Sequence, residues 1–197
     1  MTHRNMFLLM SLMLGVGYSH VGLADFVKEM SKEKEFYKKI ERAPFSIGMF
    51  YFEDKMDCNW QRNIARQKRD FRLASRSRIY HDGNMRFLGL DLSKRGLEGL
   101  DDEFEVDIMP AFVLFKHGKP LRDANKKVIK LVGFVEDTAI KKFINRHLRP
   151  AIENYIEKEA ERKAQERALN AAYFYGGWPY YGGYNGGCAG FGVGVGF

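Results

Sequence analysis

Three short apolar runs constrain the fold more than any other feature of the sequence. They are FSIGMFYF (residues 45–52), MRFLGLDL (85–92) and AFVLF (111–115). Runs of this length, rich in aromatic and aliphatic residues and bounded by charged or turn-forming residues, are typical of buried β-strands. KKVIKLVGF (126–134) has the composition of a fourth strand. The sequence therefore predicts a sheet assembled from four short strands.

The segments between these strands have the spacing of helices. Residues 59–76 are expected to form a helix whose core contacts are Trp60, Ile64, Phe71 and Leu73. Residues 135–148 carry a similar apolar face. Helices that alternate with strands, followed by a closing strand pair and a last helix, predict an α/β fold with a central mixed sheet flanked by helices.

The segment before the first predicted strand is expected to be helical. Residues 25–42 contain apolar side chains spaced by three and four positions, which predicts one or two amphipathic helical turns. Pro44 ends this element, because the residue before a proline is disfavoured in helical conformation. Residues 93–106 are expected to form a short helix or helical turns.

The first 24 residues have the pattern of a secretory signal. Arg4 precedes an apolar stretch, and the small residues Gly22 and Ala24 lie just before Asp25. The stretch is shorter than the roughly 20 residues that a membrane-spanning helix needs. Cleavage after Ala24 would remove Arg4 and lower the formal net charge of +7 by one. We expect an exported protein, periplasmic, extracellular or in a secretory lumen, with no integral membrane span; a retained N-terminal helix is the alternative.

Composition changes twice after the predicted domain, which we place at residues 25–149. Residues 150–172 are charged and favour a helix, which predicts a solvated helical extension, with a coiled-coil partner helix as the alternative. Residues 173–197 hold 10 glycines and nine aromatic residues and no charge. This low-complexity Gly/Tyr-rich tail is expected to be flexible, and its rings could support self-association.

Several classes of partner are not expected. Basic residues are scattered among acidic ones without a basic stripe, so we expect no nucleic-acid binding. His81, His117 and His147 lack metal-ligand spacing, and no nucleotide-binding glycine motif occurs. We therefore expect no metal and no cofactor.

The second half of the predicted domain carries an ordered set of family-type residues. In the stretch from MRFLGLDL to LVGF they are Asp91, Val106, Pro110, Phe115, Gly118 and Gly133. With this set, residues 45–148 resemble the thioredoxin family. The resemblance implies a thioredoxin-like fold and a cis peptide bond between Met109 and Pro110, beside a reactive thiol. It also implies that Met109 offers its backbone to a bound peptide. A trans proline that opens the strand is the alternative.

The resemblance fails at the reactive site. Family members carry two cysteines in a C-x-x-C motif, and two thiols at that spacing resolve a mixed disulfide intramolecularly. A gap-free placement sets KMDC (residues 55–58) on this motif, with Cys58 second and Lys55 first. A small insertion would instead put Cys58 first, as CNWQ. The family's buried acid is replaced by Met49, and Tyr51 retains an aromatic residue near the site.

The chemistry of Cys58 has three open interpretations. A helix N-terminus and Lys55 favour a thiolate, whereas Asp54 and Asp57 oppose it. Cys58 is a reactive monothiol, an inert buried cysteine, or the disulfide partner of Cys188.

The sequence thus predicts an exported thioredoxin-like protein that binds peptide or cysteine-bearing partners, with at most monothiol disulfide exchange. Cys58 would be the thiol, and Lys55, Tyr51, Met109 and Pro110 would surround the partner. If the protein is an enzyme, it is a weak thiol–disulfide oxidoreductase. The alternative is a non-enzymatic envelope or extracellular interaction protein that acts through its helix and Gly/Tyr-rich tail.

Overall fold

The computed structural model describes residues 27–53 and 58–176, with side chains described as far as residue 171. The predicted signal, Lys55, Cys188 and residues 177–197 of the predicted tail lie outside the described residues. The elements in chain order are β1 (Val27–Met30), α1 (Glu33–Arg42), β2 (Phe45–Tyr51), α2 (Cys58–Ser75), α3 (Arg78–Asp82), β3 (Met85–Asp91), α4 (Leu100–Glu103), β4 (Ala111–Lys116), β5 (Lys119–Pro120), β6 (Lys130–Val132) and α5 (Asp137–Gly176).

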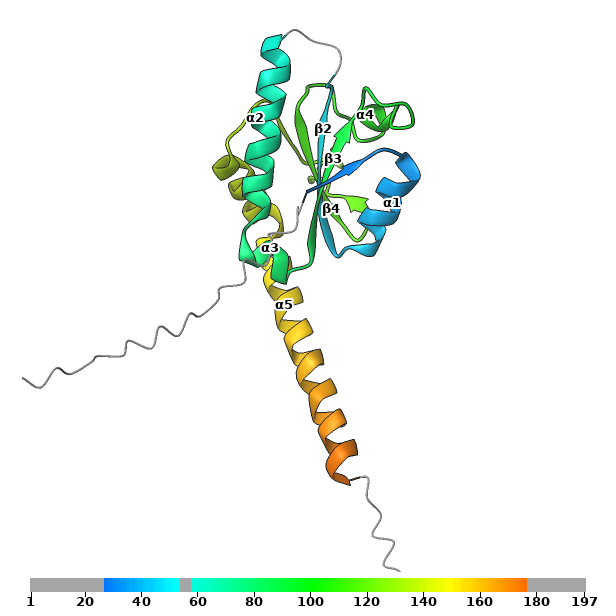
Figure 1. Ribbon diagram of the computed structural model, residues 1–197, viewed down its shortest axis with the longest axis vertical. Coiled ribbons are helices and arrows are strands. Elements are labelled where there is room, and N and C mark those ends of the chain that lie inside the picture. Colours follow the sequence, from blue (N-terminus) through cyan, green and yellow to red (C-terminus); the bar gives the residue numbers. More distant parts are fainter. Residues whose placement is uncertain (1–26, 54–57, 177–197) are drawn as a thin grey trace, which may run out of the picture.

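The strands form one mixed sheet in the order β1-β3-β2-β4-β5, with β6 also paired to β4 (Figure 1). β1, β3 and β2 run parallel to one another, and β4 runs antiparallel to β2. β5 and β6 are antiparallel to β4. The central strand β2 is buried along its whole length, as its apolar run predicts. The predicted mixed sheet flanked by helices is confirmed.

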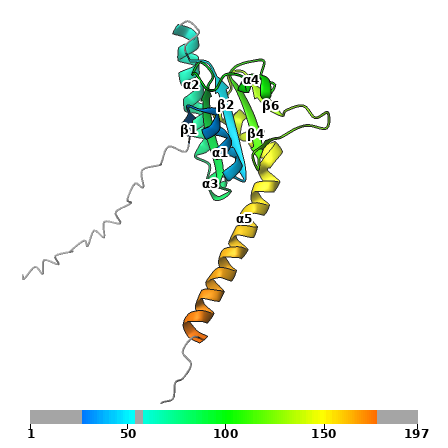
Figure 2. The same cartoon turned by 90° about the vertical axis from the view of Figure 1, so that its right-hand side faces the viewer.

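Each face of the sheet is covered by a separate apolar core. On one face, Phe36 and Ile40 of α1 and Phe104 after α4 pack against the sheet. On the other face the contacts come from α2, α3 and α5, with Phe71 and Tyr80 among the largest buried side chains. Figure 1 shows the strands between α1 and α2, and in Figure 2 α1 lies on the side of the sheet that faces the viewer. The helical faces read from the sequence therefore become two layers around one sheet.

The first strand corrects the prediction for residues 25–42. Residues 33–42 form the expected helix, but Val27–Met30 form β1, which pairs with β3 from Val27 opposite Phe87 to Met30 opposite Leu90. Val27 and Met30 are both buried, and their separation by three positions also suits a helix. Pairing with β3 decides the conformation, and that partner lies some 60 residues away in the chain.

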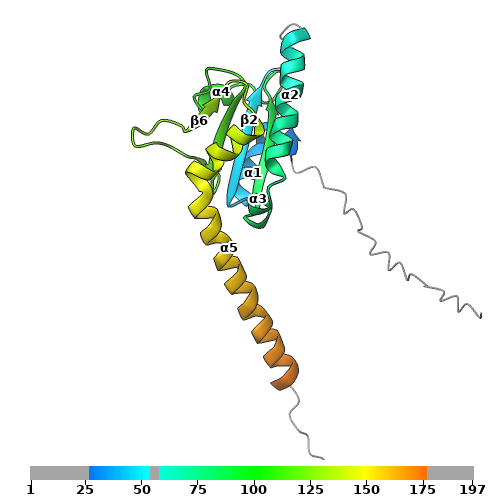
Figure 3. The same ribbon diagram turned by 90° about the vertical axis from the view of Figure 1, so that its left-hand side faces the viewer.

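Helix α5 continues without interruption through Pro150 and runs for 40 residues. Ile152 is fully buried in the same core as α2, and the Tyr155 ring packs edge-on against Phe45 at 5.9 Å. Residues 161–171 are exposed, and the helix leaves the domain as a straight arm (Figures 1 and 3). Core contacts thus extend past residue 149, where the sequence suggested a boundary. No described helix is long and apolar enough to cross a membrane.

Candidate functional site

The candidate site lies at one edge of the sheet, where β2 and β3 end and β4 begins. Tyr51 is paired with Asp91 of β3, and Phe50 with Ala111 of β4. The Met109–Pro110 peptide bond immediately before β4 is cis, as the resemblance implied. The Pro110 carbonyl accepts a hydrogen bond of 2.7 Å from the Gly133 N–H. The segments that the resemblance assigned to a site therefore meet at this edge.

Cys58 is the first residue of α2, is exposed, and has no disulfide partner among the described residues. The interpretation of Cys58 as a buried cysteine is therefore wrong. The first turn of α2 contains no acidic residue. The segment that joins β2 to this thiol, residues 54–57 with Lys55, lies outside the described residues. Pairing with Cys188 stays a prediction for the same reason.

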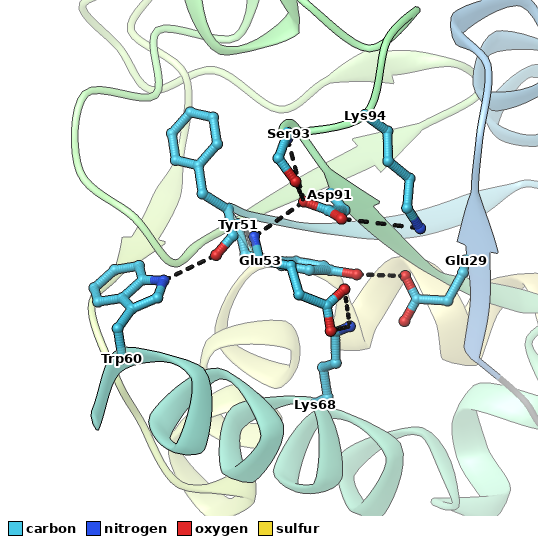
Figure 4. Close-up of polar contacts among 9 residues, drawn as sticks. Glu29, Tyr51, Glu53, Trp60, Lys68, Asp91, Ser93 and Lys94 are labelled. Atoms are coloured by element: carbon cyan, nitrogen blue, oxygen red, sulfur yellow. Dashed lines mark hydrogen bonds and ion pairs between the residues drawn. The ribbon is translucent and has the colours of Figure 1, made fainter. Parts of the chain in front are cut away.

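Trp60 ties the first turn of α2 to the sheet edge. Its indole N–H donates a 2.8 Å hydrogen bond to the Phe52 carbonyl, just after β2 (Figure 4). Its ring also lies 5.2 Å from that of Phe134 in an edge-on arrangement. Phe134 follows Gly133, which bonds Pro110. This chain of contacts brings the start of α2 and the cis-proline segment to the same rim of the domain.

Apolar side chains are exposed along this rim. Ile108, Val132 and Phe134 are 58%, 38% and 44% exposed, and Met109 is partly buried against the core. Val132 pairs with Ala111, so it lies next to the cis-proline segment. We call Ile108, Met109, Val132 and Phe134 the apolar rim. Clustered exposed apolar residues, unlike scattered ones, are typical of contact surfaces.

Asp91 holds the backbone beneath the rim. Its side chain is 2% exposed and accepts hydrogen bonds from the Glu53 N–H at 3.1 Å, the Ser93 N–H at 3.2 Å and the Ser93 hydroxyl at 2.5 Å (Figure 4). Lys94 lies 3.9 Å from the same carboxylate. Because a buried carboxylate needs several donors, Asp91 fixes the end of β2 relative to the turn after β3.

Tyr51 is fully buried, and its hydroxyl donates a 2.6 Å hydrogen bond to the Glu29 carboxylate. The Lys68 ammonium lies 4.5 Å from the centre of the Tyr51 ring and forms an ion pair with Glu53 at 3.0 Å. Burial, followed by the bond to Glu29, raises the pKa of Tyr51 far above its usual value. A side chain in this position cannot touch a bound peptide. The predicted role of Tyr51 in substrate contact is therefore corrected to one of support.

Sequence reasoning missed two parts of this support. Glu29 escaped notice because its segment was expected to be helical, and only β1 aims its carboxylate at Tyr51. A β-carbon at Gly89 would lie 2.4 Å from a Glu29 oxygen, so this glycine leaves room for the carboxylate.

Met49, at the position of the family's buried acid, is 1% exposed. No cluster of three or more metal-ligating side chains occurs in the described part of the chain.

The sheet order, the reversal of strand direction at β4 and the cis-proline before it define a thioredoxin-like fold. No protein-family model matches the chain, and no curated protein matches it. Oxidised thioredoxin from Plasmodium falciparum is 21% identical and matches 61% of this chain and 97% of its own, with a TM-score of 0.45.

Two further solved structures give similar values. Mitochondrial thioredoxin 3 from Saccharomyces cerevisiae is 21% identical over 61% of this chain and 94% of its own, with a TM-score of 0.45. Thioredoxin O2 from Arabidopsis thaliana is 16% identical over 62% of this chain and 95% of its own, with a TM-score of 0.43. At these identities the likeness concerns the fold alone.

Proposed function

We propose that this thioredoxin-like protein is exported and binds peptide or cysteine-bearing partners, with Cys58 as a single exchanging thiol. The observation that carries the proposal is the exposed position of Cys58 at the first residue of an 18-residue helix. Helix N-termini favour anions, which makes this a suitable place for a thiolate. An inert cysteine buried in the core would have no access to a partner.

The proposed reaction is one disulfide exchange. The Cys58 thiolate attacks one sulfur of a partner disulfide and forms a mixed disulfide, and the partner's other sulfur leaves as a thiolate. Release of Cys58 then needs a second thiol. No other cysteine occurs among residues 27–53 and 58–176, so that thiol would come from the partner, a small-molecule thiol or Cys188. Such a protein forms stable mixed disulfides and turns over slowly.

The apolar rim would contact the partner chain. Met109, with the backbone before the cis-proline, would hold an extended segment beside Cys58, and Phe134 would supply exposed ring surface. Lys55, three residues before Cys58 in the sequence, would add a positive charge near the thiol. Because backbone contacts and apolar side chains recognise many sequences, the proposed partner class is broad.

Trapping of mixed disulfides tests the thiol. The purified protein is incubated with a peptide that carries an activated disulfide, and the adduct is followed by mass spectrometry. We expect adduct formation in the native protein and in Cys188→Ser, and none in Cys58→Ser. Adduct formation at Cys188 alone, or the same yield in Cys58→Ser, would refute the proposed thiol. Phe134→Ala should slow adduct formation with an apolar peptide, whereas Leu169→Ala on the arm serves as the matched control.

Export is tested separately. Sequencing of the N-terminus of the protein recovered from outside the cytosol should begin at Asp25. Recovery of the intact N-terminus in the cytosolic fraction would remove export and signal cleavage from the proposal without touching the role of Cys58.

A second candidate function rests on the arm. Residues 161–171 of α5 are all exposed, and Leu169 is 61% exposed. A helix of this kind, followed by the Gly/Tyr-rich tail, suits an envelope or extracellular interaction protein that self-associates. Deletion of residues 173–197 and of residues 161–197 should then lower the number of protomers per particle, measured by analytical ultracentrifugation relative to the mass of each single chain. An unchanged number of protomers in both deletions would remove this candidate.

A further inference from the structure

A second concave surface lies at the opposite end of the sheet from Cys58. It is a groove of about 1110 Å³ between the starts of β1 and β3, the end of α1 and the root of the α5 arm. Cys58 follows the end of β2, whereas this groove borders Met85–Leu88, where the parallel strand β3 begins. The groove is therefore separate from the apolar rim.

Cationic side chains from four elements line the groove. They are Lys28 of β1, Lys39 and Arg42 of α1, Arg86 of β3, and Arg162 and Lys163 of α5. Lys28 is paired with Glu35 at 2.5 Å, and Arg162 with Glu159 at 2.9 Å. The other four cations have no ion-pair partner among the described residues. The acidic lining residues, Asp82 and Glu159, are already engaged by Arg78 and Arg162. The groove thus carries uncompensated positive charge.

The cations are close enough to repel one another. The pKa of Lys39 is lowered, first by the charge of Lys28 and next by partial burial. The charge of Arg86 is a smaller cause in the same direction. Glu35 opposes this effect but is held by Lys28. A carboxylate brought in by a ligand would offset the repulsion that Lys28 and Arg86 exert on Lys39, because a nearby opposite charge favours the charged form of Lys39.

One wall of the groove is apolar. Tyr155 and Ile156 of α5 form this wall and are only partly buried, whereas Met85, Phe87 and Leu88 of β3 belong to the core and are at most 7% exposed. A ligand that carries only negative charge would leave this surface uncovered. The volume also exceeds the roughly 300–1,000 Å³ of typical small-molecule pockets. Both features suit a chain that alternates acidic and apolar side chains.

We propose that this groove is a docking site for an acidic segment of a partner protein that also carries apolar side chains. Lys39, Arg42, Arg86 and Lys163 contact its carboxylates, and Tyr155 and Ile156 cover its apolar side chains. The same partner could present a disulfide to Cys58 or have no cysteine, because the two surfaces are at opposite ends of the sheet. The docking site therefore stands independently of the proposed thiol chemistry.

Fluorescence anisotropy with synthetic peptides tests the proposal. The probe is a labelled 12-residue peptide of alternating Glu and Leu, with two comparison peptides in which Gln replaces Glu or Ser replaces Leu. We expect the Glu/Leu peptide to bind most tightly, and its affinity to fall between 50 and 300 mM NaCl because salt screens exposed charges. Equal binding of the Gln/Leu peptide would refute the role of charge. Equal binding of the Glu/Ser peptide, or full displacement by tripolyphosphate, would identify a simple anion site and overturn the proposal.

Matched variants locate the binding surface. The double reversal Lys39→Glu with Arg86→Glu should weaken the Glu/Leu peptide by roughly tenfold or more, since each exposed pair contributes up to about 1 kcal/mol. Lys163→Glu, on the exposed arm where folding is not at risk, should weaken it by about threefold. The control reversal Lys127→Glu with Lys142→Glu makes the same charge change away from the groove. If it weakens binding as much as the groove variants, only net charge matters and the docking site is refuted. Cys58→Ser should bind the peptide as the native protein does.

Discussion

Removal of one buried hydroxyl should destabilise the domain in a way that depends on pH. Tyr51 is fully buried, and its O–H donates to the Glu29 carboxylate at 2.6 Å. A hydrogen bond to a charged acceptor contributes about 1.5–3 kcal/mol. Glu29 is only partly buried, so water can replace part of this bond in Tyr51→Phe. We therefore expect the variant to lose about 1–2 kcal/mol at pH 7, or a few degrees in Tm.

The same contact sets the direction of the pH effect. Burial and Glu29 raise the pKa of Tyr51, so the folded protein keeps this proton after the unfolded chain has released it near pH 10. Above that pH, the native protein loses about 1.4 kcal/mol per pH unit through Tyr51, and Tyr51→Phe does not. The gap in unfolding free energy between the native protein and Tyr51→Phe should therefore be present at pH 7 and close by about pH 11. Burial also raises the pKa of Tyr80, to about 12. Because Tyr80 is present in both proteins, its effect on the pH dependence cancels when their unfolding free energies are compared.

Urea unfolding followed by circular dichroism measures both effects. The unfolding free energies of the native protein and Tyr51→Phe are compared at pH 7, 9 and 11. Tyr155→Phe is the control, since its hydroxyl makes no hydrogen bond within the described part of the chain, and it should change stability by less than about 0.5 kcal/mol. A variant as stable as the native protein at pH 7, or a gap that persists at pH 11, would refute the reasoning.

Two further substitutions test the packing that surrounds α5. Gly83→Ala would put a β-carbon 2.5 Å from Cγ2 of the buried Ile152, so it should cost about 1–3 kcal/mol in unfolding free energy. The same change should cost less in an Ile152→Ala background, because alanine lacks that Cγ2 atom. The Gln67 side chain donates a 2.8 Å hydrogen bond to the Val135 C=O and accepts one of 2.7 Å from the Val135 N–H, so Gln67→Leu should cost about 1–3 kcal/mol in unfolding free energy. The control Gln61→Leu, on the exposed side of α2, should cost less than about 0.5 kcal/mol. Equal losses in the two glutamine variants would contradict this role of Gln67.

Much of the fold was accessible from the sequence because its signals are local. The apolar runs at β2, β3 and β4 are short enough to be strands, and the spacing of Trp60, Ile64 and Phe71 is that of a helix. The cis bond at Met109–Pro110 was implied by a resemblance and is confirmed. The segment of β1 was misread, because two buried residues three positions apart satisfy both a helix and a short strand.

The candidate site was predicted only in part. Cys58 was placed correctly at a helix start, since a polar residue after an apolar run is a typical helix beginning. Its exposure could not be predicted, because nothing in the sequence tells on which side of α2 the thiol lies. Tyr51 was assigned to the surface by analogy, whereas Glu29 draws its hydroxyl inward from a strand that the sequence did not identify. Trp60 was expected in the core, and its indole N–H also ties α2 to Phe52.

The sequence by itself determined the alternation of strands and helices after β1, the apolar character of β2 and the position of the single described cysteine, because these depend on composition and spacing along the chain. Tertiary structure decided which strand lies beside β3, which way Tyr51 faces and that α5 stays bound to the core through Ile152 before it becomes an arm. It also gathered Lys28, Lys39, Arg86 and Lys163 into one groove. These residues are scattered over some 135 positions, and only the packing of α1, the sheet and α5 brings their charges together.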